Sequence, residues 1–345
     1  MNVKSRQEKC KRGFTLVELL VVISIIAMLL AVLMPALSKA KRIAQGTVCA
    51  AHMRGVGMGM LAYVTEFQYF PASYLYPSNA NGGYSILNQD PSHPYGYLHW
   101  SWYLFSSGKV DAKLFSCPSM KGGGAPRTNP GSKQDDWEKG QQDQNGQASA
   151  NALMDKQAPR ISITANAAII PRNKFTSQTS EGQRVNRFVN AGELRNPSGL
   201  IMATEFNNNW KALGVQKGSG ILVKSHRPIL AFSHTGTGYK ENAVYKAPLG
   251  TPYYVYGDNA AARNFGLKSI KEVEQSTDLL DGGAGHPINA VGRHHSGSGS
   301  TSEFGGCANF IYVDGHVARK TILETLEKRE WGTKFYSITG RNDVK

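Results

Sequence analysis

The sequence lacks the local patterns by which many enzymes and metalloproteins are recognised. It contains no HExxH, GxSxG or paired-carboxylate motif. Its four cysteines show none of the CxxC-type spacings that indicate a structural zinc site, and no internal repeat is evident. We therefore expect a protein that is not an enzyme and that needs no organic cofactor.

Charge is almost absent from residues 14–37. This stretch holds no Lys, Arg, Asp, Asn or Gln, and its single charged side chain is Glu18. As a helix it would extend roughly 36 Å, which is enough to cross a hydrocarbon core of about 30 Å. A carboxylate costs on the order of 2.5–3.5 kcal/mol near the centre of a bilayer, so Glu18 needs a partner.

A basic leader precedes this apolar stretch, and no A-x-A-like cleavage site follows it, which argues against an ordinary secretory signal. Positive charge before a span keeps the N-terminus in the cytoplasm and exports the chain that follows. The formal net charge of the whole chain is +14. Beyond the leader the basic residues are scattered, so we interpret them as solvated surface and expect no nucleic-acid partner.

Residues 11–27 resemble the class III signal of type IV pilins and type II secretion pseudopilins, with the sequence KRGFTLVELLVVISIIA. The resemblance implies that a prepilin peptidase cuts between Gly13 and Phe14 and methylates the new amine of Phe14. It also implies that Pro35 lies where many members of the family kink the helix.

The resemblance places the conserved acidic residue of that family at Glu18. In a helical assembly, Glu18 of one subunit can neutralise the N-terminal amine of a neighbour, which removes two lone charges from an apolar bundle. The implied partners are the prepilin peptidase/methyltransferase, other pilin-like subunits in a homo- or hetero-oligomeric filament, the inner membrane and the assembly platform.

Beyond residue 37 the pattern becomes amphipathic, and it predicts a single helix from about Phe14 to about Phe67. The clustered Gly55, Gly57 and Gly59 predict either a break or a close backbone contact. We expect four parts: a leader at 1–13, a membrane and filament-core helix at 14–37, its amphipathic continuation at 38–70, and an extracytoplasmic head at 71–345. A polar excursion is expected at about 120–155 of the head.

Short β-branched and aromatic runs predict the strands of the head, at residues 113–119, 161–164, 199–205 and 229–232. Near the C-terminus, an alternating run leads to Asp314 and Gly315 and predicts a β-hairpin with a tight turn. The expected fold class is α+β, with a long N-terminal helix packed on an antiparallel sheet and long loops.

The whole chain also resembles the DUF1559-type (H-X9-DG) subgroup of pilin-like proteins, as found in Planctomycetes and their relatives. The resemblance rests on Cys49, on Phe70-Pro71, on the FSCP sequence at 115–118, on the NPS sequence at 196–198, and on an Arg-His element before Asp-Gly. The subgroup has nine residues between its His and Asp-Gly, whereas eighteen separate His295 from Asp314 here. A Gly/Ser insertion at roughly 297–305 accounts for the difference.

Two sets of side chains leave alternatives open. Cys49 and Cys117 form either a disulfide or two buried free thiols, and Cys307 is left over. His295, Asp314 and His316 either clamp the structure or bind a metal ion, and we favour the clamp because the turn alone explains Asp314.

The sequence thus predicts a structural pilin-like subunit, anchored as a single-pass protein in the inner membrane, with its head periplasmic or in a cell-surface filament. The alternative is a membrane-anchored glycan-binding protein or enzyme that uses a pilin-type export signal.

Overall fold

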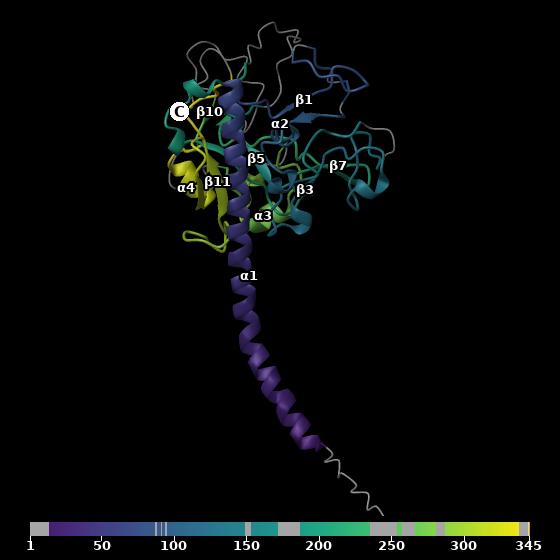
Figure 1. The fold of residues 1–345 in the computed structure, drawn as a ribbon, viewed down its shortest axis with the longest axis vertical. Helices are drawn as coiled ribbons and strands as arrows, with labels where there is room; N and C mark the ends of the chain where they lie inside the picture. The colour runs from purple at the N-terminus through teal and green to yellow at the C-terminus, as the bar shows by residue number, and fades with distance from the viewer. Residues whose placement is uncertain are drawn as a thin grey trace, which may run out of the picture. The chain divides into compact units, whose positions relative to one another are not determined.

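A computed structural model of the chain describes residues 14–86, 88–90, 92–93, 95–148, 153–171, 187–234, 254–256, 266–280, 287–337 and 344. The predicted leader, including Gly13, lies outside these residues. The chain divides into two units, Met1–Ala44 and Gln45–Lys345. Figure 1 labels the main helices and strands.

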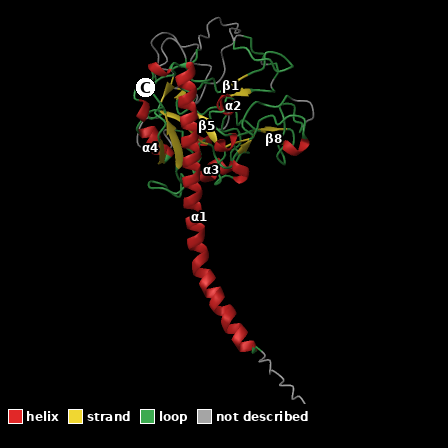
Figure 2. Ribbon diagram, viewed as in Figure 1, coloured by secondary structure: helices red, strands yellow, loops and turns green. Residues whose placement is uncertain are grey.

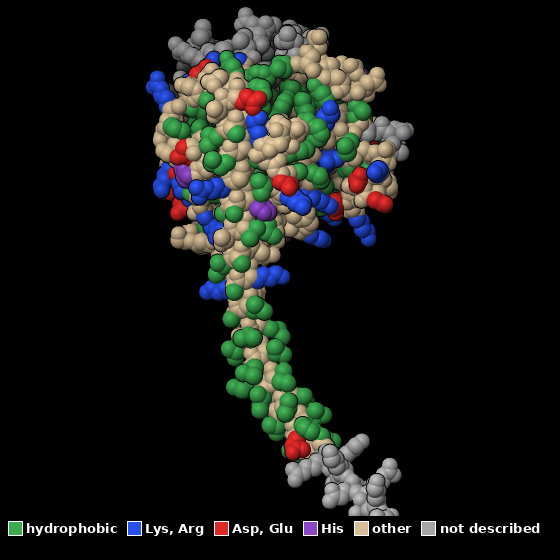
Figure 3. All heavy atoms as spheres, viewed as in Figure 1, with side chains coloured by type: hydrophobic (Ala, Val, Ile, Leu, Met, Phe, Trp, Pro, Cys, Tyr) green, Lys and Arg blue, Asp and Glu red, His purple; other side chains and the backbone are tan. Residues whose placement is uncertain are grey.

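Helix α1 runs from Leu16 to Phe67 and contributes to both units. Its start and end confirm the prediction of one long helix. Pro35 lies inside α1, and the helix continues on both sides of it. By length and composition alone, α1 could cross a membrane. Figure 3 shows apolar side chains along the N-terminal part of the helix.

Within the second unit, α1 buries one face, formed by Cys49, Met53, Val56, Met60 and Val64. The spacing of three and four residues places these side chains on a single helical stripe that faces the core. The helix is unbroken across the glycine cluster. A Cβ atom added at Gly57 would lie 2.9 Å from Cγ2 of Ile311 and 3.5 Å from the carbonyl oxygen of Gly315. Of the two predicted alternatives, the structure shows the close contact.

The core sheet of the second unit is four-stranded and antiparallel, in the order β12-β11-β6-β5. Its strands are β5 (Ile163–Ala165), β6 (Ile201–Glu205), β11 (Ala308–Tyr312) and β12 (Val317–Lys320). Figure 2 draws the strands in yellow and labels β5. Every residue of β6 and β11 is buried, so the centre of the sheet is covered on both faces. Together with α1, this sheet confirms the predicted α+β class.

Among the described residues, four further antiparallel sheets have two strands each. They pair β1 (Tyr74–Leu75) with β2 (Leu98–His99), β3 (Ala125–Pro126) with β4 (Arg160–Ile161), β7 (Val215–Lys217) with β8 (Gly220–Leu222), and β9 (Ser233–His234) with β10 (Tyr254–Val255). The short α-helices are α2 (Trp100–Ser106), α3 (Ile270–Gln275) and α4 (Ile322–Glu327). The 3-10 helices are η1 (Ala112–Phe115), η2 (Lys121–Gly123), η3 (Gln134–Asp136), η4 (Ala191–Glu193), η5 (Pro197–Gly199) and η8 (Pro287–Ala290).

The predicted hairpin is confirmed by β11 and β12, which pair Ile311 with Val317. The amide of Gly315 donates to the carbonyl of Tyr312, and Gly315 adopts a φ of +86°. The amide of Tyr312 donates to the carbonyl of His316 at 3.0 Å, so the loop between them has three residues, 313–315. A left-handed conformation at the last position of such a loop favours glycine.

Two of the strand predictions are wrong. Residues 113–119 begin inside the 3-10 helix η1, because the carboxylate of Asp111 accepts a hydrogen bond from the amide of Lys113 at 2.8 Å and caps the turn. Residues 229–232 do not form a strand, and Ile229 makes one isolated parallel β-bridge with Asn166. The predictions at 161–164 and 199–205 overlap β4, β5 and β6.

The polar segment expected at 120–155 contains buried side chains, among them Asn129, Trp137 and Asp155. Burial raises the pKa of Asp155 to about 7, although its carboxylate accepts hydrogen bonds from the amides of Tyr97 and Asn129. These contacts attach the described part of the segment to the rest of the head.

We predict that Gly57→Ala destabilises the protein. The added methyl group would displace Ile311 at a cost of about 1–3 kcal/mol, which exceeds the gain in helix propensity of up to about 1 kcal/mol. Denaturant unfolding of the full chain in detergent would measure the loss. In a double-mutant cycle, Ile311→Ala should remove part of the cost, and strictly additive effects would contradict the contact.

Candidate functional site

The N-terminus of α1 carries a capping box formed by Thr15 and Glu18. The Glu18 carboxylate accepts hydrogen bonds from the amide of Thr15 at 2.9 Å and from its hydroxyl at 2.7 Å. In return, the Glu18 amide donates to the Thr15 hydroxyl oxygen at 3.2 Å. This is the reciprocal arrangement of an S/T-x-x-E sequence, in which each side chain satisfies an amide that the helix leaves free.

Glu18 therefore has a partner inside its own chain. Sequence reasoning missed Thr15, although the capping-box spacing was readable at positions 15 and 18. The cap satisfies hydrogen bonds but supplies no positive charge, and no ion pair of Glu18 is found among the described residues. A cation from elsewhere is still needed to neutralise that charge in an apolar setting.

The apolar part of α1 exposes its side chains on every face. Between residues 16 and 37, the large apolar side chains are exposed by fractions that run from 43 % for Leu30 to 79 % for Leu16, and Phe14 is 72 % exposed. A helix that is apolar on all sides needs lipid or other apolar helices around it. This segment can insert into a membrane or pack against copies of itself.

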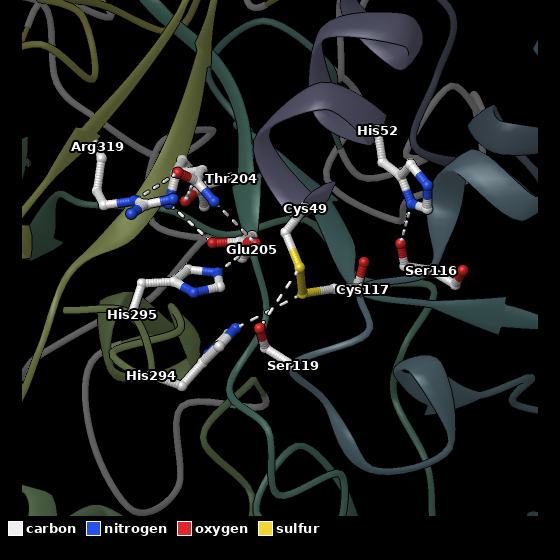
Figure 4. A network of polar contacts seen from close by, with 12 residues as sticks. Cys49, His52, Ser116, Cys117, Ser119, Thr204, Glu205, His294, His295 and Arg319 are labelled. Atoms are coloured by element: carbon white, nitrogen blue, oxygen red, sulfur yellow. Dashed lines mark hydrogen bonds and ion pairs between the residues drawn. A yellow bond between two sulfur atoms is a disulfide. The ribbon is translucent and has the colours of Figure 1, made fainter. Parts of the chain in front are cut away.

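A second candidate site is a buried polar network in the head, shown in Figure 4. Nε2 of His295 lies 2.9 Å from Oε1 of Glu205, and the side chains of this pair are 2 % and 0 % exposed. The amide of Asn309 donates to Oε2 of Glu205 at 2.8 Å, and its side-chain amide donates to Oε1 at 3.2 Å. Nε of Arg319 donates to Oδ1 of Asn309 at 3.1 Å.

Strand pairing positions the members of this network. Glu205 ends β6, and Asn309 lies on the neighbouring strand β11. His295 is held by two backbone hydrogen bonds with Cys307, which directly precedes β11. Three segments that are distant in sequence therefore meet at one end of the sheet.

The cysteine pair lies beside this network. Cys49 of α1 and Cys117 form a disulfide with their Cα atoms 5.0 Å apart. Nε2 of His294 lies 4.0 Å from Sγ of Cys117, and Figure 4 shows His294, His295 and the disulfide grouped around Glu205. Cys307 is a buried free thiol.

Burial acts in opposite directions on the charged groups of the site. It disfavours the Glu205 carboxylate, but the hydrogen bond and charge of His295 outweigh burial, so the pKa of Glu205 is lowered. Burial lowers the pKa of His294 to about 4, so this imidazole is neutral near pH 7. Burial also raises the pKa of the Cys307 thiol, which leaves it an unreactive thiol at neutral pH.

The three residues predicted as a clamp or metal site do not come together. Nδ1 of His316 pairs with Oδ1 of Asp314 at 2.6 Å in the exposed hairpin turn, where the His316 ring stacks on Tyr312. His295 lies beside Cys307, at the opposite end of β11. Six residues separate Cys307 from Asp314, and the extended strand β11 is among them, so the span is about 20 Å. The three side chains therefore share no site.

The network instead gathers metal-binding atoms that the sequence did not group together. One ligand atom from each of Cys49, Cys117, Glu205 and His295 lies within 4.8 Å of all the others, and all four residues are buried. Glu205 was not among the predicted site residues, because it lies 90 residues from His295 in the sequence. The disulfide between Cys49 and Cys117 crosslinks α1 to the loop after η1. Beside it, the buried carboxylate of Glu205 pairs with His295.

A separate open pocket of about 640 Å³ lies in the head, between the η4–η5 region and the segment after α4. Its lining includes Arg195, Arg329 and Lys334. Three cations around one cavity can attract anions.

Residues 9–34 match the prokaryotic N-terminal methylation motif. The chain carries a prepilin-type signal. This signal implies processing by a prepilin peptidase, and together with the apolar helix α1 it fits a membrane-anchored pilin-like protein. No curated protein and no solved structure matched the chain.

We predict that His295→Leu destabilises the protein by about 3–5 kcal/mol, because it leaves the buried carboxylate of Glu205 without its partner. Denaturant unfolding of the full chain would measure the loss. His316→Leu is the matched control, since its pair with Asp314 is exposed and should be worth less than about 1 kcal/mol. Equal effects of the two substitutions would contradict the assigned role of His295.

We also predict that the Glu205 pair makes the protein acid-sensitive. The pKa of the Glu205 carboxyl group is lower in the folded protein than in the unfolded chain. Its contribution to the free energy of unfolding is therefore complete above the unfolded pKa and is lost as the pH falls through the folded pKa. Between pH 7 and pH 3, the free energy of unfolding should fall with decreasing pH less steeply in Glu205→Gln than in the wild type. The two slopes should differ by up to about 1.4 kcal/mol per pH unit. An unchanged slope would show that this group does not control acid stability.

Proposed function

We propose that the chain is a structural pilin-like subunit of a type IV pilus or a type II secretion pseudopilus-like filament. The supporting observation is the match of residues 9–34 to the methylation motif at the start of a helix whose apolar side chains are all exposed up to Leu37. The described part of the chain leaves these apolar side chains uncovered. Such a segment is suited first to a bilayer and then to a bundle of identical or related helices.

In this proposal the subunit enters the inner membrane with its N-terminus cytoplasmic and its head outside. The basic leader favours this orientation. Cleavage after Gly13 then creates a methylated amine on Phe14, at the end of α1 where Glu18 lies. The amine of one subunit meets Glu18 of a neighbour, which provides the cation that the Thr15 cap does not supply.

The head is proposed as a non-catalytic domain of the DUF1559-type subgroup. The order of Cys49, Phe70-Pro71, the FSCP sequence and the hairpin supports this assignment. The buried side chains of the His295 network favour a stabilising role, because a catalytic base must reach its substrate.

The capping box permits a sharp test of Glu18. Glu18→Gln removes the charge but keeps a side chain that can still accept the hydrogen bonds of the cap. Thr15→Ala removes the cap hydroxyl, at a cost of about 0.5–2 kcal/mol, and keeps the charge. If the charge pairs subunits, Glu18→Gln should abolish filament assembly while Thr15→Ala retains most of it.

The readouts for this test are filaments sheared from cells and the intact mass of the subunit in the membrane fraction. Both variants should yield a processed chain that begins at methylated Phe14. Normal filaments from Glu18→Gln would refute the pairing of charges. A mature N-terminus beyond Pro35 would refute the proposed processing route, and loss of assembly in Thr15→Ala alone would assign the role of Glu18 to the cap.

A further inference from the structure

The buried cluster of Cys49, Cys117, Glu205 and His295 has the composition of a zinc site. Two thiolates, one imidazole and one carboxylate are all established zinc ligands. The four residues are exposed by only 1 %, 1 %, 0 % and 4 %, which is typical of a closed structural site and not of an open catalytic one.

The spacing of the four ligand atoms suits one ion. Atoms bound to the same tetrahedral zinc lie about 3.3–3.8 Å apart, given bond lengths of about 2.0–2.3 Å. The four atoms already lie within 4.8 Å of one another. A shift of about 1 Å, together with separation of the two sulfur atoms, would complete the tetrahedron.

Hydrogen bonds from neighbouring residues fix two of the proposed ligands, Glu205 and His295. The amide and the side chain of Asn309 fix the carboxylate of Glu205, and Arg319 fixes the side chain of Asn309. Backbone hydrogen bonds to Cys307 fix His295. Outer partners of this kind orient metal ligands and typically contribute 10–100-fold to affinity.

His294 offers a fifth donor atom, a second imidazole nitrogen. Its Nε2 lies 4.0 Å from Sγ of Cys117, and its buried Nδ1 has no hydrogen-bond partner among the described residues. The site therefore has a spare ligand next to one of its sulfur atoms.

We propose that the head binds one zinc ion through Cys49, Cys117, Glu205 and His295 when its disulfide is reduced, so that the ion and the disulfide exclude each other. An external dithiol supplies the two electrons and two protons that convert the disulfide into two thiols, and the dithiol itself becomes a disulfide. Zinc then displaces the thiol protons and binds the thiolates. In the reverse direction an external disulfide takes two electrons from the two thiolates and two protons from solvent and becomes two thiols, while the Cys49–Cys117 bond forms and the ion is released. The site would hold α1 to the loop after η1 before the disulfide exists.

The test uses the full chain in detergent, freed of metal by a chelator and then reduced with a dithiol that is removed before titration. Cobalt(II) is the probe, because tetrahedral thiolate coordination gives strong visible bands and a near-ultraviolet charge-transfer band. We expect one cobalt ion per reduced chain, its displacement by one zinc ion, and no such spectrum from the oxidised chain. A reduced wild-type chain without this spectrum would overturn the proposal, whatever any variant does.

The variants separate the ligands from the fold. Cys49→Ser lacks the disulfide just as the reduced chain does, so the two differ by a single ligand atom. Its cobalt affinity should fall by more than about 100-fold, beyond the loss typical of an outer partner. Glu205→Gln and His295→Asn should also weaken binding and alter the visible bands.

Cys307→Ser is the matched control, because this buried thiol is not one of the four ligands. Its binding and spectrum should equal those of the wild type. Loss of cobalt in Cys307→Ser, or unchanged binding in Cys49→Ser, would overturn the assignment. The experiment needs no filament, so its result is independent of the proposed role in assembly.

Discussion

The head depends on the close packing of α1 against β11. The helix presents no side chain at Gly57, and this lets Ile311 and the hairpin glycine Gly315 approach its backbone. Both contact partners belong to one hairpin, so the position of the helix and the position of the turn are set together. The buried helical stripe from Cys49 to Val64 extends this contact along the core.

The polar network at the end of the sheet reinforces the same packing. Glu205, His295 and Asn309 join β6, β11 and the segment that precedes β11. The adjacent disulfide joins α1 to the loop after η1. A buried carboxylate is tolerated here because three hydrogen-bonding contacts, one with the imidazole of His295 and two with the backbone and side-chain amides of Asn309, replace the water that it loses. The same density of donor atoms gives the reduced cluster its capacity to hold a metal ion.

The N-terminal part of α1 follows the opposite rule. Between residues 16 and 37 its large apolar side chains are exposed, and they lie on all faces of the helix. Thr15 satisfies the hydrogen bonds of Glu18 but not its charge. A single helix thus serves two environments: its apolar part needs partners outside the chain, and its amphipathic part finds them in the head.

The sequence by itself determined α1, the prepilin-type signal and the β11–β12 hairpin, because each depends on periodicity or short spacing within one segment. It did not reveal the 3-10 helix at Ala112–Phe115, where one capping carboxylate outweighs strand propensity. The tertiary structure alone decided that His295 pairs with Glu205, 90 residues away. Contacts across such separations arise from strand order and register, and no local pattern encodes them.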